Sequence, residues 1–171
     1  MNTLITGLGN PILGDDGVGW VVAQKVADLL QAPNPGLKVE CYALAGISLM
    51  EQMIGFEHVI LIDSLNTGNF LPGTIVNFTL DSLIDPSYGH SSSAHDLTLK
   101  KALALGRSVG VDLPVDREVY IIAIEARHGY EFGETLSSEI EAAVPFAVQE
   151  VIRLYESMQI EALSVESNTT L

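Results

Sequence analysis

The chain of 171 residues has a single cysteine, Cys41, and only eight basic side chains. One thiol cannot form an internal disulfide or build a zinc site from several thiolates. No apolar run reaches the roughly 18 residues that a membrane-spanning helix needs. Residues 1–6 also lack the basic start and long apolar run of a signal peptide. We therefore expect a protein of the reducing cytoplasm that has no membrane partner.

Acidic side chains outnumber basic ones by 22 to 8, so the formal net charge is −14. A surface of this sign repels phosphates, which argues against nucleic-acid binding. The charge could steer a basic segment of a partner toward an acidic cleft, although the simpler interpretation is that it maintains solubility. The length and the 47% of apolar residues fit one domain. We expect it to span residues 1–158, followed by a flexible polar tail at 159–171.

Apolar runs alternate with helical periodicity along the chain. We expect strands at residues 4–9, 37–43, 58–63, 74–79 and 119–124. We expect helices at residues 17–30, 48–55, 94–110 and 137–157. The helix at 48–55 should begin with a capping box from Ser48 to Glu51, and the helix at 137–157 should bend or restart at Pro145. This alternation is typical of an α/β domain with a mainly parallel sheet. Ligands of such sheets bind beyond the carboxyl ends of the strands.

The first polar segment at a strand end is the glycine-rich loop at residues 7–19, with the sequence GLGNPILGDDGVG. Its glycines allow tight turns and close backbone contacts. The loop is similar to a dinucleotide-binding fingerprint, but Ile12 stands where the third glycine belongs, and no Walker Gly-Lys-Ser/Thr follows. The carboxylates of Asp15 and Asp16 would oppose an anion and suit a cation better. The alternative is that both acids only cap the helix.

Two further polar residues follow predicted strands. Asp63 ends the apolar run 59–62, where a carboxylate needs a charge partner, hydrogen bonds or a metal. The alternative is a hydrogen bond to the following turn. Residues 93–96, SAHD, have the form of a capping box, which places His95 in the first turn of a helix. The positive helix end favours the neutral imidazole that binds metals, although an exposed loop histidine is the alternative.

Asp16, Asp63 and His95 are thus two carboxylates and one imidazole at three separate strand ends. Oxygen and nitrogen ligands without a thiolate suit a divalent ion such as nickel or zinc, held with open positions. The sequence indicates no covalent nucleophile. Cys41 lies inside a predicted strand with no histidine placed beside it, and the serines at 91–93 have no recognisable Asp–His pair.

Several separated motifs resemble those of the [NiFe] hydrogenase maturation endopeptidases, over about residues 3–155. The strongest similarity is GLGN through GDDGVG, residues 7–19. VILID at 59–63 and SAHDL at 93–97 are similar to the second and third family motifs, and residues 124–137 resemble the late strand and loop. The chain departs from the family at two positions. Asp16 is shorter than the glutamate of some members, and Glu125 stands near the position where many members carry a Pro-Glu or Gln-Pro pair.

The resemblance implies a three-layer sandwich, in which helices cover both faces of a twisted, mostly parallel five-stranded sheet. It also implies an endopeptidase that removes the C-terminal extension of a [NiFe] hydrogenase large-subunit precursor after nickel insertion. The site residues that it implies are Asp16, Asp63 and His95, the three positions already indicated. Nickel is expected to arrive with the precursor, no organic cofactor is expected, and the enzyme is expected to be a monomer.

The chemistry of these three residues stays open at this point. They could engage the nickel as a recognition handle, with the metal or a carboxylate activating water. Alternatively, Asp16 and Asp63 could share a proton and activate water without a metal. Two functions without proteolysis also stay open: a nickel metallochaperone, and a nucleotide- or phosphate-binding module built on the glycine loop.

Overall fold

A computed structural model describes residues 2–30, 34–83, 94–127 and 132–168; the side chains of residues 94–98 and 165–168 lie outside this description. The strands are β1 (Thr3–Leu8), β2 (Leu37–Tyr42), β3 (His58–Leu65), β4 (Ile75–Thr79) and β5 (Val119–Glu125). The helices are α1 (Val18–Leu29), α2 (Gly46–Gln52), α3 (Ala94–Ser108) and α4 (Ser138–Asn168). No helix within the described ranges is long and apolar enough to cross a bilayer.

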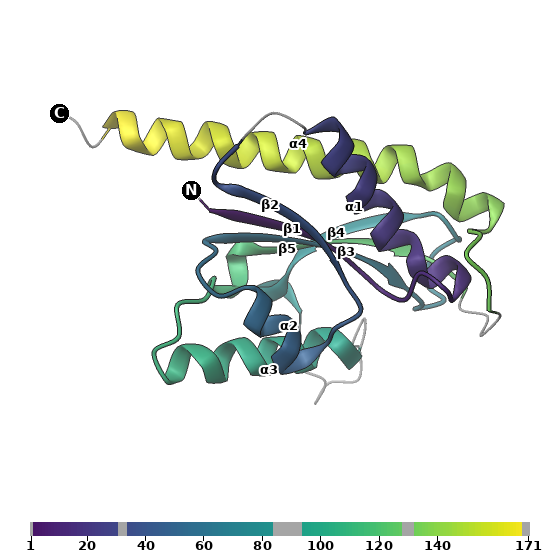
Figure 1. The fold of residues 1–171 in the computed structure, drawn as a ribbon, viewed down its shortest axis with the longest axis horizontal. Coiled ribbons are helices and arrows are strands. Elements are labelled where there is room, and N and C mark those ends of the chain that lie inside the picture. The colour runs from purple at the N-terminus through teal and green to yellow at the C-terminus, as the bar shows by residue number, and fades with distance from the viewer. Residues whose placement is uncertain (1, 31–33, 84–93, 128–131, 169–171) are drawn as a thin grey trace.

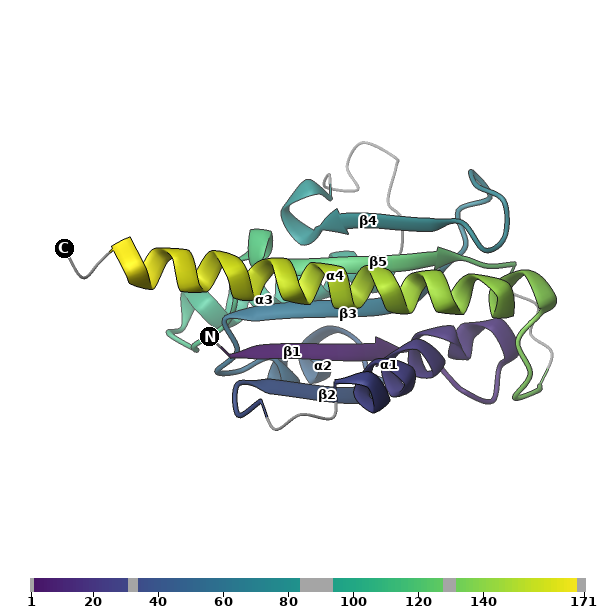
Figure 2. The same cartoon turned by 90° about the horizontal axis from the view of Figure 1, so that it is seen from above.

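The five strands form one sheet in the order β2-β1-β3-β5-β4. Four of them run parallel, and β4 pairs with β5 in the antiparallel direction at one edge. Helices α1 and α4 cover one face of the sheet, and α2 and α3 cover the other (Figure 1). The view from above shows α4 running along the strands (Figure 2). The predicted mostly parallel α/β sandwich is therefore confirmed.

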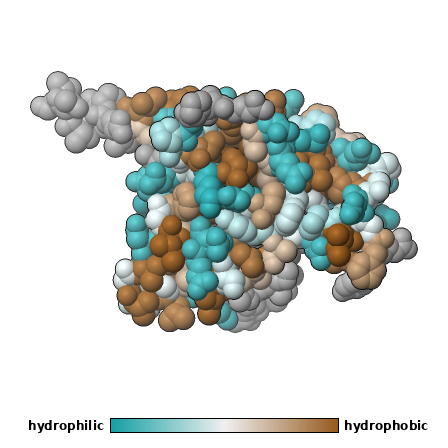
Figure 3. Space-filling model, viewed as in Figure 1, coloured by the Kyte–Doolittle hydropathy of each residue, from teal (hydrophilic) through white to brown (hydrophobic). Residues whose placement is uncertain are grey.

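A hydrophobic core lies on each face of the sheet. Each central strand contributes side chains to both cores, because successive side chains point to opposite faces of the sheet. In β3, Ile60 and Ile62 pack with α1 and α4, whereas Val59 and Leu61 pack with α2 and α3. A strand buried on both faces needs a nearly continuous apolar sequence, which explains the run at 59–62. The alternation also places Asp63 on the same face as Leu61, toward α2 and α3. On the face shown in Figure 3, hydrophobic residues are interspersed with polar ones.

The structure corrects several predicted boundaries. Helix α2 begins at Gly46 after the N-cap Ala45, so Ser48 lies inside the helix and forms no capping box. Helix α4 neither restarts at Pro145 nor ends at 157 but continues to Asn168. An interior proline costs about 3 kcal/mol, whereas burying each large apolar side chain contributes about 1.5–3 kcal/mol. The buried neighbours of Pro145 therefore outweigh its cost; they are Val144, Ala147, Val148 and Val151.

The end of α4 was predicted too early because a helix without Gly or Pro has no local stop signal. Residues 158–168 contain neither residue type and include several good helix formers. Figure 1 shows this part of α4 projecting past the edge of the sheet. Its exposed apolar side chains include Ile160 and Leu163. Residues 159–168 are thus helical, and the expected flexibility of the segment 159–171 stays a prediction.

Two glycines allow α1 to start in direct contact with the sheet. A Cβ atom on Gly19 would lie 2.4 Å from the carbonyl oxygens of Leu8 and Ile62, and one on Gly7 would lie 2.2 Å from the carbonyl oxygen of Gly19. Such distances are far below van der Waals contact, so only glycine fits at either position. The contact brings the 3₁₀ turn η1 (Gly14–Gly17), which precedes α1, to the carboxyl ends of β1 and β3.

We expect Gly19→Ala to destabilise the fold although alanine is the better helix former. The gain in helix propensity is about 1 kcal/mol, whereas a Cβ forced against two backbone carbonyls should cost about 3 kcal/mol. Urea unfolding measures the net loss. Gly133→Ala is the matched control, because a Cβ there meets nothing within 4 Å. Equal stability of the two variants would contradict the packing account.

Candidate functional site

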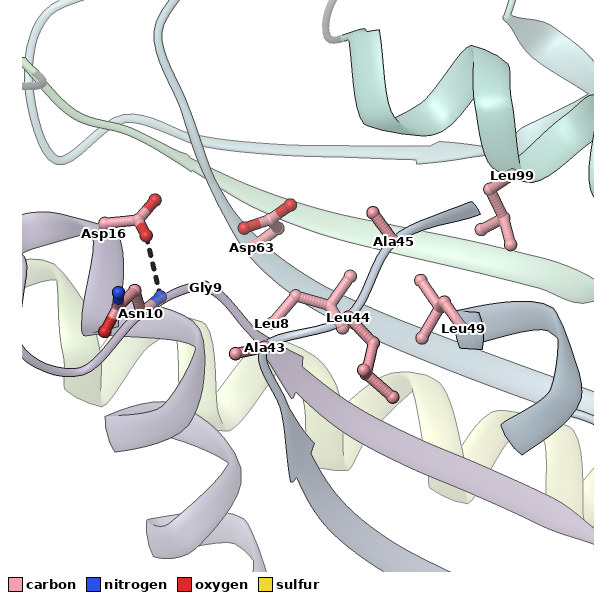
Figure 4. A pocket seen from close by; sticks show the side chains of 10 residues that line it. All are labelled: Leu8, Gly9, Asn10, Asp16, Ala43, Leu44, Ala45, Leu49, Asp63 and Leu99. Carbon is pink, nitrogen blue, oxygen red and sulfur yellow. Dashed lines mark hydrogen bonds between the residues drawn. The ribbon is translucent and has the colours of Figure 1, made fainter. Parts of the chain in front are cut away.

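A cavity of about 260 Å³ lies at the carboxyl ends of β1 and β3, on the face covered by α2 and α3. Figure 4 shows the side chains around it. Asp16 comes from η1, Asp63 from β3, and the residues between β2 and α2 form the opposite wall. The full lining is Leu8, Gly9, Asn10, Asp16, Ala43, Leu44, Ala45, Leu49, Asp63 and Leu99. Two of the three predicted site residues therefore share one cavity, at the edge of the sheet where ligands were expected.

Asp16 is held in place by the glycine loop that carries it. Its Oδ2 accepts a hydrogen bond of 2.7 Å from the backbone N–H of Asn10, and its Oδ1 accepts one of 3.1 Å from the hydroxyl of Ser64. The turn depends on Gly9, whose φ is +112° and whose added Cβ would lie 1.9 Å from the carbonyl oxygen of Asp16. The loop thus closes around its own carboxylate. This arrangement counts against the phosphate-binding alternative, because a bound anion would face that carboxylate.

Asp63 lies inside β3, two residues before the strand ends, and its side chain is half-buried. Its Oδ1 accepts a hydrogen bond of 2.8 Å from the backbone N–H of Ser64. This bond differs from the alternative role, a hydrogen bond to the following turn, because the donor Ser64 still lies within β3; the side chain also lines the cavity. A local hydrogen bond and a role in the cavity do not exclude each other, because a carboxylate has several acceptor positions.

Ser64 links the two acids and was missed in the sequence. Only 8% of the residue is exposed; its backbone N–H binds Asp63 while its hydroxyl binds Asp16. A polar residue directly after the acid, inside an otherwise apolar strand, is the signal that could have indicated it. Ser64 is a positioning residue, because it fixes one carboxylate relative to the other without lining the cavity itself.

The adjacent acid, Asp15, binds a different part of the molecule. Its Oδ1 accepts a 2.7 Å hydrogen bond from the backbone N–H of Ser137, and its Oδ2 accepts a 2.9 Å bond from the Ser137 hydroxyl. Ser137 directly precedes α4, where a negative charge interacts favourably with the positive end of the helix. Asp15 therefore supports the start of α4 rather than that of α1. The two neighbouring acids of the motif thus have different hydrogen-bond partners.

His95 lies in the first turn of α3, as predicted from the capping pattern. Its side chain lies outside the described residues, so the structure does not place the imidazole relative to Asp16 and Asp63. Leu99, one helical turn later, lines the cavity. Among the residues whose side chains are described, no group of three histidine, cysteine or acidic side chains could hold a metal ion.

The only thiol of the chain is poorly suited to nucleophilic chemistry. Burial raises the pKa of the Cys41 thiol, and the neighbouring Glu40 carboxylate raises it further. Cysteine reacts as the thiolate, so a raised pKa makes the group less reactive at neutral pH. The sulfur lies 3.8 Å from the carbonyl oxygen of Trp20, and Cys41 is not among the residues that line the cavity.

Glu125, at the end of β5, is a buried acid whose contacts the sequence did not reveal. Only 2% of the residue is exposed, yet its carboxylate has three donors: Oε1 accepts from the N–H groups of Thr67 and Gly68, and Oε2 accepts from the Thr67 hydroxyl. The distances are 2.9, 2.7 and 2.9 Å in that order. A buried charge without such partners would be costly. Glu125 therefore anchors the loop that follows β3, next to the strand that carries Asp63.

We expect Glu125→Gln to be milder than Glu125→Leu. The glutamine oxygen can still accept both N–H groups, and the Thr67 hydroxyl can rotate to accept from the new amide, so the cost should be about 1 kcal/mol. Leucine leaves these buried donors unmatched and should cost about 3 kcal/mol. Urea unfolding of both variants gives the difference. A leucine variant as stable as the glutamine variant would show that the three hydrogen bonds do not stabilise the loop.

Sequence comparisons relate the chain to one family of enzymes. The hydrogenase maturation protease family matches residues 44–154. This range contains Asp63 and His95 and begins after the loop that carries Asp16. The hydrogenase 2 maturation protease of Escherichia coli K12 is 22% identical over 167 residues, covering 98% of each chain. That similarity includes the glycine loop.

Solved structures show the same fold. The hydrogenase maturating endopeptidase HybD of E. coli superposes with a TM-score of 0.71 at 23% identity, covering 92% of this chain and 94% of that chain. The [NiFe] hydrogenase maturation protease HybD of Thermococcus kodakarensis has a TM-score of 0.69 at 25% identity, with 90% and 99% of the two chains covered. Sheet and helices are thus shared along nearly the whole chain.

Proposed function

Because this chain belongs to the hydrogenase maturation protease family and is a peptide-bond hydrolase, we propose that it removes the C-terminal extension of a [NiFe] hydrogenase large-subunit precursor after nickel insertion. The nickel belongs to the substrate, and Asp16, Asp63 and His95 engage it. One observation carries this proposal: two acids that are distant in sequence line a single cavity at the carboxyl ends of the strands.

The donor set fits a divalent ion such as nickel. Two carboxylates supply oxygen ligands, and an imidazole adds a nitrogen ligand. His95 precedes the cavity-lining Leu99 by four residues on α3. Residues four apart lie on the same face of a helix, which supports a place for His95 at the rim of the cavity. The three ligands would leave positions for the ligands that the precursor itself supplies.

The residues of this chain contribute fixed charges and a base. Asp16 is oriented by Asn10 and Ser64, and Asp63 by Ser64, before any substrate binds. Preorganised groups of this kind need little rearrangement during the reaction. One of the two carboxylates takes a proton from the attacking water. When bound with the precursor, the nickel supplies a fixed point that positions the scissile bond.

The partner is a single precursor chain in the cytoplasm, on which the enzyme acts as a monomer. The net charge of −14 favours a precursor tail with basic residues, because unlike charges speed the encounter.

The assay is shortening of a cognate precursor, measured by mass. We expect Asp16→Asn, Asp63→Asn and His95→Ala each to lower kcat/KM by about 100-fold or more, as for removal of a ligand or a general base. Asp15→Asn is the matched control, because its carboxylate binds Ser137 and not the cavity. Near-normal cleavage by His95→Ala would remove the metal-handle mechanism and favour a proton-sharing acid pair. Nickel transfer without shortening by the wild type would indicate a metallochaperone.

Ser64→Ala tests the positioning of the two acids. The variant loses the hydroxyl that holds Asp16 but keeps the N–H that holds Asp63. We expect kcat to fall about tenfold with KM nearly unchanged, because one hydrogen bond to a charged group is worth about 1.5–3 kcal/mol. Ser64→Thr, which keeps the hydroxyl, should recover part of the loss. An unchanged kcat in Ser64→Ala would show that Asp16 needs no such support.

A further inference from the structure

The wall of the cavity opposite the acids is a stretch of main chain without a strand partner. Pairing between β1 and β2 ends at Leu8 and Tyr42. Beyond this pair, the β1 chain turns away at Gly9, where φ is +112°. The chain after β2 continues through residues 43–45 to α2. Residues 43–45 thus leave the sheet and cross to α2, and no strand of the described sheet lies beside them (Figure 4).

The backbone groups of this segment are available for binding. All three residues are exposed, and Ala45 has extended geometry with φ −144° and ψ 165°. Within the part of the chain that the structure describes, the N–H groups of residues 43–45 and the carbonyl groups of Ala43 and Leu44 form no hydrogen bond. An exposed stretch of main chain with unpaired N–H and carbonyl groups can serve as a template for an added extended peptide.

The template and the acids face the same cavity. Ala43, Leu44 and Ala45 line one side, and Asp63 and Asp16 line another (Figure 4). An extended chain rises about 3.3 Å per residue, so the segment can pair with roughly three residues of a peptide. The small side chains of Ala43 and Ala45 leave room beside the template for the main chain of that peptide. A peptide paired there enters the cavity that both carboxylates line.

We propose that the C-terminal segment of the precursor binds as an extended strand against the main chain of residues 43–45, which presents its scissile bond to Asp63 and Asp16. The inference rests on the proposed function and names the form in which the substrate is recognised. Main-chain hydrogen bonds supply the affinity, so the residues flanking the cut can vary in side chain. The N–H groups that face residues 43–45 cannot be removed without loss, because main-chain pairing depends on them.

A proline scan of the precursor tests this pairing without altering the enzyme. Proline removes one N–H group at a time, and alanine at the same position is the control for the side chain. Successive residues of an extended chain direct their N–H groups to opposite sides. We therefore expect kcat/KM to fall at least tenfold at alternate positions beside the cut, relative to alanine. Equal effects of proline and alanine at every position would overturn the proposal.

The complementary variant changes the template. The double variant with Ala43→Pro and Leu44→Pro removes the N–H groups of both residues, so it removes the one that faces the peptide. We expect it to lower kcat/KM at least tenfold. Val115→Pro is the control. Val115 is apolar and exposed and lies outside the cavity lining, and its φ of −76° is one that proline adopts. Thermal unfolding identifies a template variant that fails to fold, in which case the precursor scan decides.

Binding of the precursor, measured beside cleavage, separates this inference from the proposed function. A precursor that binds with proline-sensitive affinity but is not shortened supports strand pairing and contradicts the proposed function. A precursor that wild type and template variant shorten equally supports the protease and overturns strand pairing. A cognate precursor that neither binds nor is shortened overturns both.

Discussion

The contact between glycine backbones at the start of α1 is the constraint on which the site depends. Gly7 and Gly19 let the helix begin directly against β1 and β3. Any side chain at these positions would push η1 away from the sheet, and Asp16 would move with it. The glycines that look like a nucleotide-binding loop therefore serve packing within the chain. They bring a carboxylate to the strand ends, where a nucleotide-binding loop would hold a phosphate.

The free-energy cost of taking negatively charged carboxylates out of water shapes the rest of the site. The chain keeps several acids near one edge of the sheet and gives each its own donors: Asn10 and Ser64 for Asp16, Ser64 for Asp63, and Thr67 and Gly68 for Glu125. Donors spread the charge over backbone amides and hydroxyls. Of these acids, Asp16 and Asp63 line the cavity, and the unpaired main chain of residues 43–45 lies opposite them.

The fold and the shared position of Asp16 and Asp63 at the strand ends could be predicted from the sequence, because both depend on patterns along the chain. Apolar runs alternating with helical periodicity indicate parallel strands, and the carboxyl ends of such strands meet at one edge. Contacts between distant residues are not visible in this way: the donors to Glu125 lie 57 or 58 residues away. The unpaired backbone of residues 43–45 carries no signal in residue type. Helix α4 exceeded its predicted end because its sequence contains no local stop.

The central claim is that nickel within the precursor directs this protease to its substrate. The most direct measurement mixes the purified enzyme with nickel-loaded and nickel-free forms of one cognate large-subunit precursor and follows the mass of the large subunit. The account predicts shortening of the nickel-loaded form alone. Equal shortening of both forms would keep the protease but contradict the claim that Asp16, Asp63 and His95 act through the metal.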